Sequence, residues 1–281
     1  MRTAYVVLTY NRSDALLAVL RGLAPQCGGN DVVVVADDGS RPEHVQALRT
    51  GLPKFDCPVR HVWHPDTGFT AARARNLGAL HAGADYIVFM DGDCIPNPRF
   101  ARQHALLAAP GYFVNGSRVL LSEALSASVL SGQVNLAALG VSEWLRLRLS
   151  GGINKLSHLV RWPGAPARDE AAFRWKGIRS CNFGVWYGDL QAVNGFDESF
   201  SGWGHEDADL VLRLHHAGLA RRNGFWGTEV FHLWHQENSR ADEAANRERV
   251  HQRVDSRVVR AGRGLAEAAA GPLAVVTELN R

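Results

Sequence analysis

The sequence predicts an α/β fold with a mostly parallel, Rossmann-like sheet flanked by helices. Two observations predict it. Over the first 120 residues, short apolar runs alternate with helical segments, the order typical of parallel strands covered on both faces. Polar residues directly follow three of these runs, and a sheet of this class binds ligands at the carboxyl ends of its strands. Hydrophobic residues make up 46% of the 281 residues, enough for a core without disulfides.

The elements of the first half follow in order. Strands are expected at residues 6–8, 32–35, 59–63 and 86–90. Helices are expected at residues 13–23, 40–49 and 70–82. We expect Ser13 and Ser40 to cap the first two helices, the second through a capping box with Glu43.

The second half is less regular. A helix is expected over residues 120–139, and residues 144–149 alternate apolar with basic side chains. Glycines and prolines predict loops at 151–152 and 162–166. A further helix is expected from about residue 206 to 217. After residue 240 the chain is rich in Ala, Arg and Glu, which predicts a helical tail to about residue 270 and a fraying end.

Composition limits which classes of partner and cellular location are expected. The net charge is +3, from 31 basic and 28 acidic residues, which gives no reason to expect a nucleic-acid partner. Four cysteines without CxxC spacing predict free thiols in a reducing compartment. The N-terminal apolar run is too short for a signal peptide, and no run approaches the roughly 20 residues that span a bilayer. A cytoplasmic location is expected, with peripheral membrane contact through residues 144–148 and 158–162 as one reading. An acceptor loop or amphipathic strand is the other.

Two polar clusters follow the first two strands: Thr9-Tyr10-Asn11-Arg12 and Asp37-Asp38-Gly39-Ser40. A carboxylate at such a strand end can accept hydrogen bonds from a base or ribose. A dinucleotide fold would place a GxGxxG loop after the first strand, and none is present. A hydride-transfer enzyme is therefore not expected.

A third cluster, Asp91-Gly92-Asp93, follows the strand at 86–90. Two carboxylates one residue apart on a turn can face one divalent cation, which in turn binds a diphosphate. Further along, His232 and His235 stand three residues apart. Imidazole ligands favour Mn²⁺ over Mg²⁺, although Mg²⁺ remains an alternative. The sequence therefore predicts a metal site.

The fourth cluster is Gly202-Trp203-Gly204-His205-Glu206-Asp207-Ala208-Asp209. Carboxylates in a first helical turn are favoured by the helix dipole, which would be a purely structural role. An aromatic side chain between two glycines instead suits a loop against a sugar. We expect Glu206 and Asp207 to be functional, and Asp209 to form an ion pair with Arg213, four residues on.

Together these clusters resemble GT-A glycosyltransferases of the family-2-like type. The segment Gly68-Phe69-Thr70-Ala71-Ala72-Arg73-Ala74-Arg75-Asn76 is similar to that family's Gly-x-x-x-Ala-Arg-Asn segment. The stretch from Gly195 to Leu210 looks like the C-terminal catalytic segment of β-1,4-galactosyltransferases and polypeptide N-acetylgalactosaminyltransferases. The resemblance covers roughly residues 3–240. It departs from the galactosyltransferases at His232, where Met is typical, and at His205, where a small residue is usual.

The resemblance implies a role for each candidate residue. Donor-binding residues would be Thr9, Asn11, Asp38, Arg73, Asp91 and Trp203. Metal ligands would be Asp93, Asp91, His235 and His232. Asp207 would be the catalytic base, and Glu206 would bind sugar hydroxyls. Three regions are expected: a nucleotide-sugar-binding half at 1–115, an acceptor-binding and catalytic half of the same domain at 116–239, and the helical tail at 240–281.

The predicted function is inverting, metal-dependent transfer of a sugar from a nucleotide diphosphate to a hydroxyl of a glycan, a lipid-linked or a small-molecule acceptor. The resemblance favours UDP-hexose or UDP-N-acetylhexosamine. The alternative enzyme is a nucleotidyltransferase, which normally has a Gly-rich, basic loop after the first strand. The alternative outside enzymes is a non-catalytic nucleotide- or sugar-binding module. Neither the acceptor nor the oligomeric state follows from the sequence.

Overall fold

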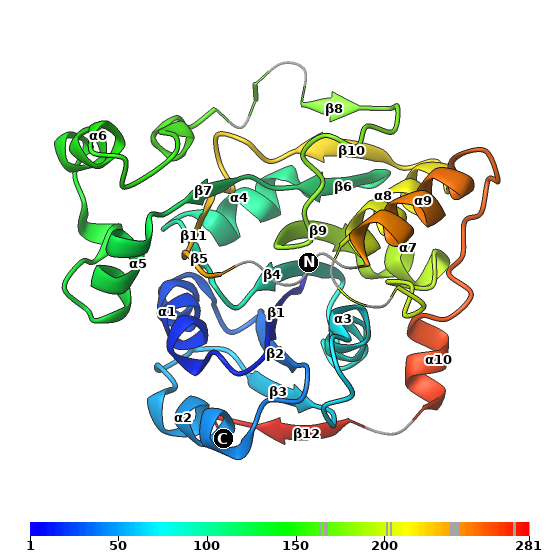
Figure 1. Cartoon of the computed structure of the whole chain (residues 1–281), viewed down its shortest axis with the longest axis horizontal. Helices are drawn as coiled ribbons and strands as arrows, with labels where there is room; N and C mark the ends of the chain where they lie inside the picture. The colour runs from blue at the N-terminus through cyan, green and yellow to red at the C-terminus, as the bar shows by residue number, and fades with distance from the viewer. Residues whose placement is uncertain are drawn as a thin grey trace.

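The computed structural model describes residues 1–162, 164–165, 168–200, 202, 204–236, 242–271 and 274–280. Within them the strands form a large sheet, ordered β12-β3-β2-β1-β4-β9-β6-β10-β8, and a small sheet, ordered β5-β11-β7. Figure 1 shows helices on both sides of the large sheet, with β12 along one edge. The predicted α/β fold is confirmed.

The strands of the large sheet are β1 (Thr3–Thr9), β2 (Val32–Asp37), β3 (Val59–Trp63), β4 (Tyr86–Asp91), β6 (Tyr112–Asn115), β8 (Asp169–Glu170), β9 (Asn182–Trp186), β10 (Ala220–Asn223) and β12 (Val275–Glu278). Those of the small sheet are β5 (Cys94–Pro96), β7 (Arg118–Leu120) and β11 (Val230–His232). The four strands predicted in the first half are all present.

The α-helices are α1 (Ser13–Leu23), α2 (Pro42–Gly51), α3 (Ala71–Leu80), α4 (Phe100–Leu107), α5 (Glu123–Leu130), α6 (Val141–Leu149), α7 (Tyr187–Ala192), α8 (Glu206–His216), α9 (Glu243–Val254) and α10 (Leu265–Ala270). Short 3-10 turns stand at Ala24–Gln26, Leu136–Ala138 and Ser157–Leu159. None of the helices in the described part of the chain is long and apolar enough to cross a membrane.

Strands β3, β2, β1 and β4 of the large sheet are parallel, and β1, β2 and β4 are buried on both faces. Along β1, Tyr5 and Val7 pack with α1, whereas Ala4 and Val6 pack with α3, because successive strand residues point to opposite faces. The parallel register pairs Thr9 with Asp37 and Leu8 with Asp91. The carboxyl ends of three strands therefore meet at one edge, as the alternating pattern predicted.

The sheet changes direction beyond β4. Strand β9 runs antiparallel to both β4 and β6. The loop before β9 and the start of β4's following turn therefore lie at the same edge. This reversal brings residues from the second half of the chain to the ligand-binding edge formed by the first half.

Both predicted serine caps are wrong. Helix α1 has Arg12 at its N-cap position, and Ser13 Oγ lies 3.0 Å from His44 Nδ1. Helix α2 starts at Pro42, which lacks an N–H and so suits the first turn. Ser40 instead accepts a hydrogen bond from the backbone N–H of Asn11, so it joins two loops.

Three segments of the second half also differ from expectation. The helix expected over 120–139 is interrupted, because β7 takes its start and Gly132, at φ +79°, follows its first helical part. The alternating segment 144–149 is part of helix α6. The expected fraying end instead forms β12, which pairs antiparallel with β3. Alternation of residue types alone did not distinguish helix from strand in these short segments.

Candidate active site

A cavity of about 1170 Å³ opens at the edge where the strand ends meet. Most of the residues predicted to be functional line it: Thr9, Asp38, Asp91, Asp93, Glu206, Asp207, His232 and His235. We call the side formed by the ends of β1, β2 and β4 the strand wall. The opposite side, formed by β7, the loop before β9, the start of α8 and the segment after β11, we call the helix wall.

On the strand wall, Asp38 is buried and tied to the start of α3. Its Oδ2 accepts from the backbone N–H of Thr70 at 3.0 Å, and its Oδ1 accepts from the Thr70 hydroxyl. His64 Nε2 lies 3.1 Å from the same Oδ1. These contacts fix the carboxylate at the cavity wall.

Asn11 is part of the loop scaffold and does not line the cavity. It adopts a left-handed conformation at φ +49°, which Asn tolerates better than most residues. Its Oδ1 accepts from the backbone N–H of Arg41 at 2.9 Å, and its own N–H donates to Ser40 Oγ. Asn11 therefore joins the loops that follow β1 and β2.

Arg75 connects the two walls. Its side chain is 3% exposed. One guanidinium nitrogen donates to Asp91 Oδ1 at 2.9 Å, and another donates to Glu206 Oε1 at 3.1 Å. The planar fork of arginine suits two carboxylates at once. Arg75 thus holds the end of β4 against the start of α8.

Arg73, the arginine singled out from the sequence, lies away from the cavity. Its guanidinium is 3.5 Å from Glu198 and approaches Gly271 at the end of α10. The resembling segment ends in Ala74-Arg75-Asn76, so the signal for Arg75 was already in the sequence. Two residues along a helix turn a side chain by about 200°, which explains the different placement.

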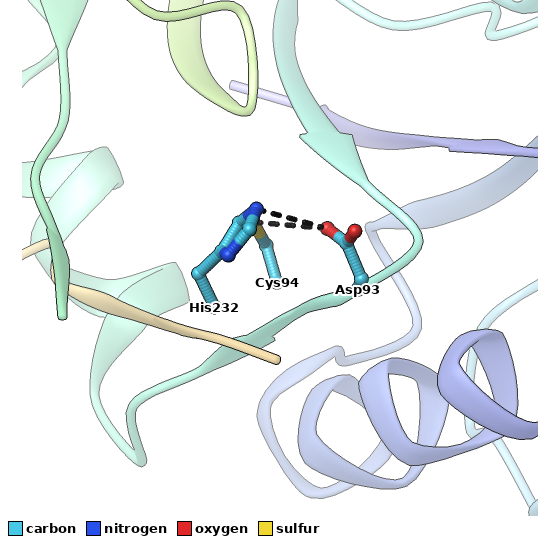
Figure 2. A group of neighbouring side chains, drawn as sticks. All are labelled: Asp93, Cys94 and His232. Carbon is cyan, nitrogen blue, oxygen red and sulfur yellow. Dashed lines mark hydrogen bonds and ion pairs between the residues drawn. The ribbon is translucent and has the colours of Figure 1, made fainter. Parts of the chain in front are cut away.

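Asp93 lies between two histidines. His235 Nε2 is 3.2 Å from Asp93 Oδ2, and His232 Nε2 is 3.8 Å from Asp93 Oδ1. Figure 2 shows the carboxylate directed at the His232 ring and at the sulfur of Cys94. Arg12 also approaches Asp93, at 3.9 Å. The pairing of β11 with β5 explains the contact, since it places His232 beside Cys94.

The donor set at Asp93 fits a divalent cation such as Mn²⁺. It combines a carboxylate oxygen with imidazole nitrogens, a mixture that Mn²⁺ accepts. Burial lowers the pKa of His232, which favours the neutral ring that a metal requires. Burial and Cys181 raise the pKa of the Cys94 thiol well above its usual value, and Mn²⁺ prefers oxygen and nitrogen ligands to thiolate sulfur. Asp91 has one oxygen occupied by Arg75.

Glu206 and Asp207 stand in the first turn of α8. His205 precedes them in a left-handed conformation, at φ +68°, and turns the chain sharply into the helix. Asp207 accepts hydrogen bonds from the backbone N–H groups of Ser180 and Ala208. Burial raises the pKa of both carboxyls, and the proximity of Asp207 adds to the effect on Glu206. Raised pKa values suit groups that exchange protons.

Asp209 is structural, as predicted. It is fully buried and pairs with Arg213 at 2.8 Å and with Arg253 of α9. Trp203 lies outside the described residues.

Several cavity residues had not been singled out for the active site. They are Tyr10, Phe69, Arg118, Trp175, Arg179, Trp234, Arg247 and His251. Most of them come from segments without a recognisable motif, so only the fold brings them together. The exceptions are Tyr10, in the first polar cluster, Phe69, in the segment similar to the family's, and Trp234, between the two predicted histidines.

Solved structures of similar fold show which fold class this chain belongs to. One similar structure is S. aureus TarS 1–349 in complex with UDP-GlcNAc, with a TM-score of 0.57, 15% identity, and coverage of 95% of this chain and 69% of that one. Another is GalNAc-T7 with UDP, GalNAc and Mn²⁺, with a TM-score of 0.54, 15% identity, and coverage of 90% and 48%. The chain therefore has the GT-A glycosyltransferase fold.

Two family models match successive segments of the chain. Residues 5–127 match the model for glycosyl transferase family 2, and residues 168–236 match the model described as the N-terminal domain of galactosyltransferase. The chain thus carries a family 2 glycosyltransferase region followed by a galactosyltransferase-type segment, as the sequence motifs indicated.

Two curated relatives are also similar to the chain in sequence. Validoxylamine A glucosyltransferase of Streptomyces hygroscopicus subsp. jinggangensis is 30% identical over 238 residues, which cover 81% of this chain and 55% of the relative. Chondroitin synthase of Escherichia coli is 27% identical over 252 residues, which cover 83% of this chain and 34% of the relative. The chain spans about half the length, or less, of these two relatives.

Proposed function

We propose that this protein is an inverting, metal-dependent glycosyltransferase that moves a sugar from a nucleotide diphosphate donor to a hydroxyl of a glycan or glycoconjugate. One observation carries the proposal. The buried carboxylates Glu206 and Asp207 share a single cavity with Asp93 and its two histidines. We infer from this shared lining that a proton acceptor and a diphosphate site adjoin the same space, which a sugar would occupy.

The strand wall would hold the donor. Thr9 and Asp38 line the cavity at the ends of β1 and β2, where sheets of this class bind nucleotides. Asp91 has one oxygen free of Arg75 for the ribose or the cation. UDP is the favoured nucleotide, because the two solved structures of similar fold described above contain UDP-GlcNAc and UDP.

Asp93, His235 and His232 would hold the cation, with Mn²⁺ favoured and Mg²⁺ as the alternative. When bound, the cation offsets the charge that develops on the leaving diphosphate. Arg12 lies 3.9 Å from Asp93, so its guanidinium can supply additional positive charge there. Positive charge placed in advance at a developing anion lowers the barrier to the reaction.

The helix wall would perform the proton transfer. Asp207 is held by two backbone N–H groups and faces the cavity, where it can take the proton of the incoming hydroxyl. Glu206, aligned by Arg75, would accept hydrogen bonds from sugar hydroxyls. The hydroxyl then attacks the anomeric carbon from the face opposite the diphosphate, so an α-linked donor gives a β-linked product.

The three-part division of the chain at residues 115 and 239 remains part of this proposal. It assigns donor binding to the first part, and acceptor binding and catalysis to the second. The described start of the third part already contributes to the cavity, because Glu243, Arg247 and His251 of α9 line it.

The test is product analysis. Purified protein is incubated with a panel of UDP-, GDP- and dTDP-sugars, with Mn²⁺ or with EDTA, and nucleotide release is measured. The anomeric configuration of the transferred or hydrolysed sugar is then read by NMR. We expect release from one nucleotide class, only with the metal, and a β configuration. A product that keeps the α configuration would contradict the inverting assignment.

A further inference from the structure

Two arginines on the helix wall, Arg118 and Arg179, form no ion pair with a carboxylate of the described residues, although the charge of Asp207 acts on Arg179. Arg118 opens β7, and Arg179 precedes β9 by three residues. Both are partly buried and both line the cavity. Arg75 differs, because two carboxylates neutralise it. Partly buried guanidinium groups without a counter-ion are unusual, since burial penalises an unpaired charge.

The two side chains also lie close enough to repel each other. Burial, followed by the charge of Arg118, lowers the pKa of Arg179. Burial also lowers the pKa of Lys155; the charge of Glu229 opposes this effect, and the charges of Arg179 and Arg118 add to it. Lys155 donates a hydrogen bond to Ser117 Oγ at 2.6 Å, directly beside Arg118. Three cations therefore gather in this part of the cavity wall.

Arg179 lies beside the base, whereas Arg118, on the strand that pairs with β11, also lies close to His232. The backbone N–H of Ser180, next to Arg179, donates to Asp207. In the sheet order β2-β1-β4-β9-β6, the strand ends with Thr9 and Asp38 lie to one side of β4. Arg179, before β9, and Arg118, shortly after β6, lie to the other. In Figure 1, β6 and β7 lie across β4 from β2 and β3.

We propose that Arg118 and Arg179 bind a carboxylate, sulfate or phosphate group of the acceptor, so that the acceptor is an anionic glycan or glycoconjugate. This inference rests on the proposed function. Guanidinium groups pair with such anions through two parallel hydrogen bonds. An acceptor anchored in this way presents a neighbouring hydroxyl to Asp207, while its charge replaces the missing counter-ion.

The experiment uses the whole chain with saturating UDP and Mn²⁺, so that the donor phosphate site is filled. D-glucuronate and glucose 6-phosphate are titrated as anionic probes, and D-glucose as the neutral probe, with saturation-transfer NMR. We expect the anionic probes to bind the wild type more tightly than glucose. Arg118→Gln and Arg179→Gln should each weaken that binding by about tenfold or more, the effect of losing a charged hydrogen bond.

Arg146→Gln is the matched control, because Arg146 is exposed on α6 and does not line the cavity. It should leave probe binding unchanged. UDP affinity, measured in parallel, should be the same in all variants. Because Arg118 has no ion pair and lies near Arg179, Arg118→Gln should also leave the melting temperature unchanged or raise it.

Two results would overturn the inference. Anionic probes that bind only in the absence of UDP, or UDP affinity that falls in the arginine variants, would assign these arginines to the donor diphosphate. Absence of anion binding with and without UDP would remove the subsite. Failure of the proposed function is distinct, because it would show as a wild type that does not bind UDP in a metal-dependent manner.

Discussion

The carboxylates of the two cavity walls are positioned in different ways. Asp91 and Asp93 follow a parallel strand that is buried on both faces, so the sheet itself fixes their backbone. Glu206 and Asp207 stand at the start of a helix, after the left-handed turn at His205. The strand-wall carboxylates thus take their backbone position from the sheet register, whereas Glu206 and Asp207 are held in place by contacts with Arg75 and Ser180, which are distant in the sequence. Substitutions can separate the two dependencies.

The largest effect is expected for Asp207→Asn. The amide cannot accept the hydroxyl proton, so transfer should fall by about a thousandfold, within the range for loss of a general base. Binding of UDP at the strand wall should be unchanged. Steady-state rates and calorimetry check both. A variant that keeps more than a tenth of the activity would exclude Asp207 as the base, and intact biological function would favour a non-catalytic binding module.

Trp144→Ala should have the largest effect on stability. Trp144 was a candidate for membrane contact, yet it is 4% exposed. Its ring stacks on the ring of Phe231, with 5.0 Å between the ring centroids. Its loss would leave a cavity behind β11 and should cost about 3–5 kcal/mol in the free energy of unfolding. Urea denaturation measures this change in the free energy of unfolding. The control Leu145→Ala, at a position 46% exposed, should change it by less than about 0.5 kcal/mol.

Arg75→Gln should affect both walls. It leaves Asp91 and Glu206 without their shared cation, which should cost about 3 kcal/mol of stability, as for other buried pairs that lose one partner. Transfer activity should fall as well, because Glu206 loses its alignment. Arg73→Gln is the informative comparison, since Arg73 lies outside the cavity wall. Equal loss of UDP binding in both variants would mean that Arg73 has the donor role first expected.

The smallest expected effect is on the pH dependence of kcat/KM. Burial raises the pKa of Asp207 and Glu206, so the base is protonated at pH values above the ordinary carboxyl range. We therefore expect kcat/KM to rise with pH through a pKa higher than that of a free Asp, by about tenfold per unit on the acid side. Asp207→Asn should remove this limb. A rate independent of pH down to the ordinary range would contradict the assignment.

The same two carboxyls predict how stability depends on pH. Their pKa values are raised in the folded state, so the folded chain binds more protons than the unfolded chain. Their contribution is therefore favourable at low pH and is lost as pH rises through the raised values. A chain with Asp207→Asn should lose part of this dependence, which thermal unfolding at several pH values can measure.

The strand wall could be predicted from the sequence to a large extent. Continuous apolar strands fix where β1, β2 and β4 end, and polar residues at those ends face the cavity for that reason alone. The errors concerned which partners individual side chains at those strand ends contact. Ser40 and Asn11 hold loops together, which depends on the approach of two loops 29 residues apart in the chain.

The helix wall could be predicted only where a motif was present. Glu206, Asp207, His232 and His235 were found because they stand in recognisable clusters. Arg118 and Arg179 were missed, since each is a lone arginine in a segment without periodic signal, and only the pairing of β7, β9 and their neighbours brings them to the cavity. The C-terminal strand β12 was missed because its partner, β3, lies more than 200 residues earlier.

The most direct measurement is UDP binding by calorimetry, with Mn²⁺ and with EDTA, on the wild type, Asp93→Ala and Arg146→Gln. The account predicts that the wild type and Arg146→Gln bind UDP with Mn²⁺ and lose most of that affinity in EDTA, and that Asp93→Ala binds weakly in both. Wild-type binding that is equally tight in EDTA, or unchanged in Asp93→Ala, would contradict a metal-dependent donor site at Asp93.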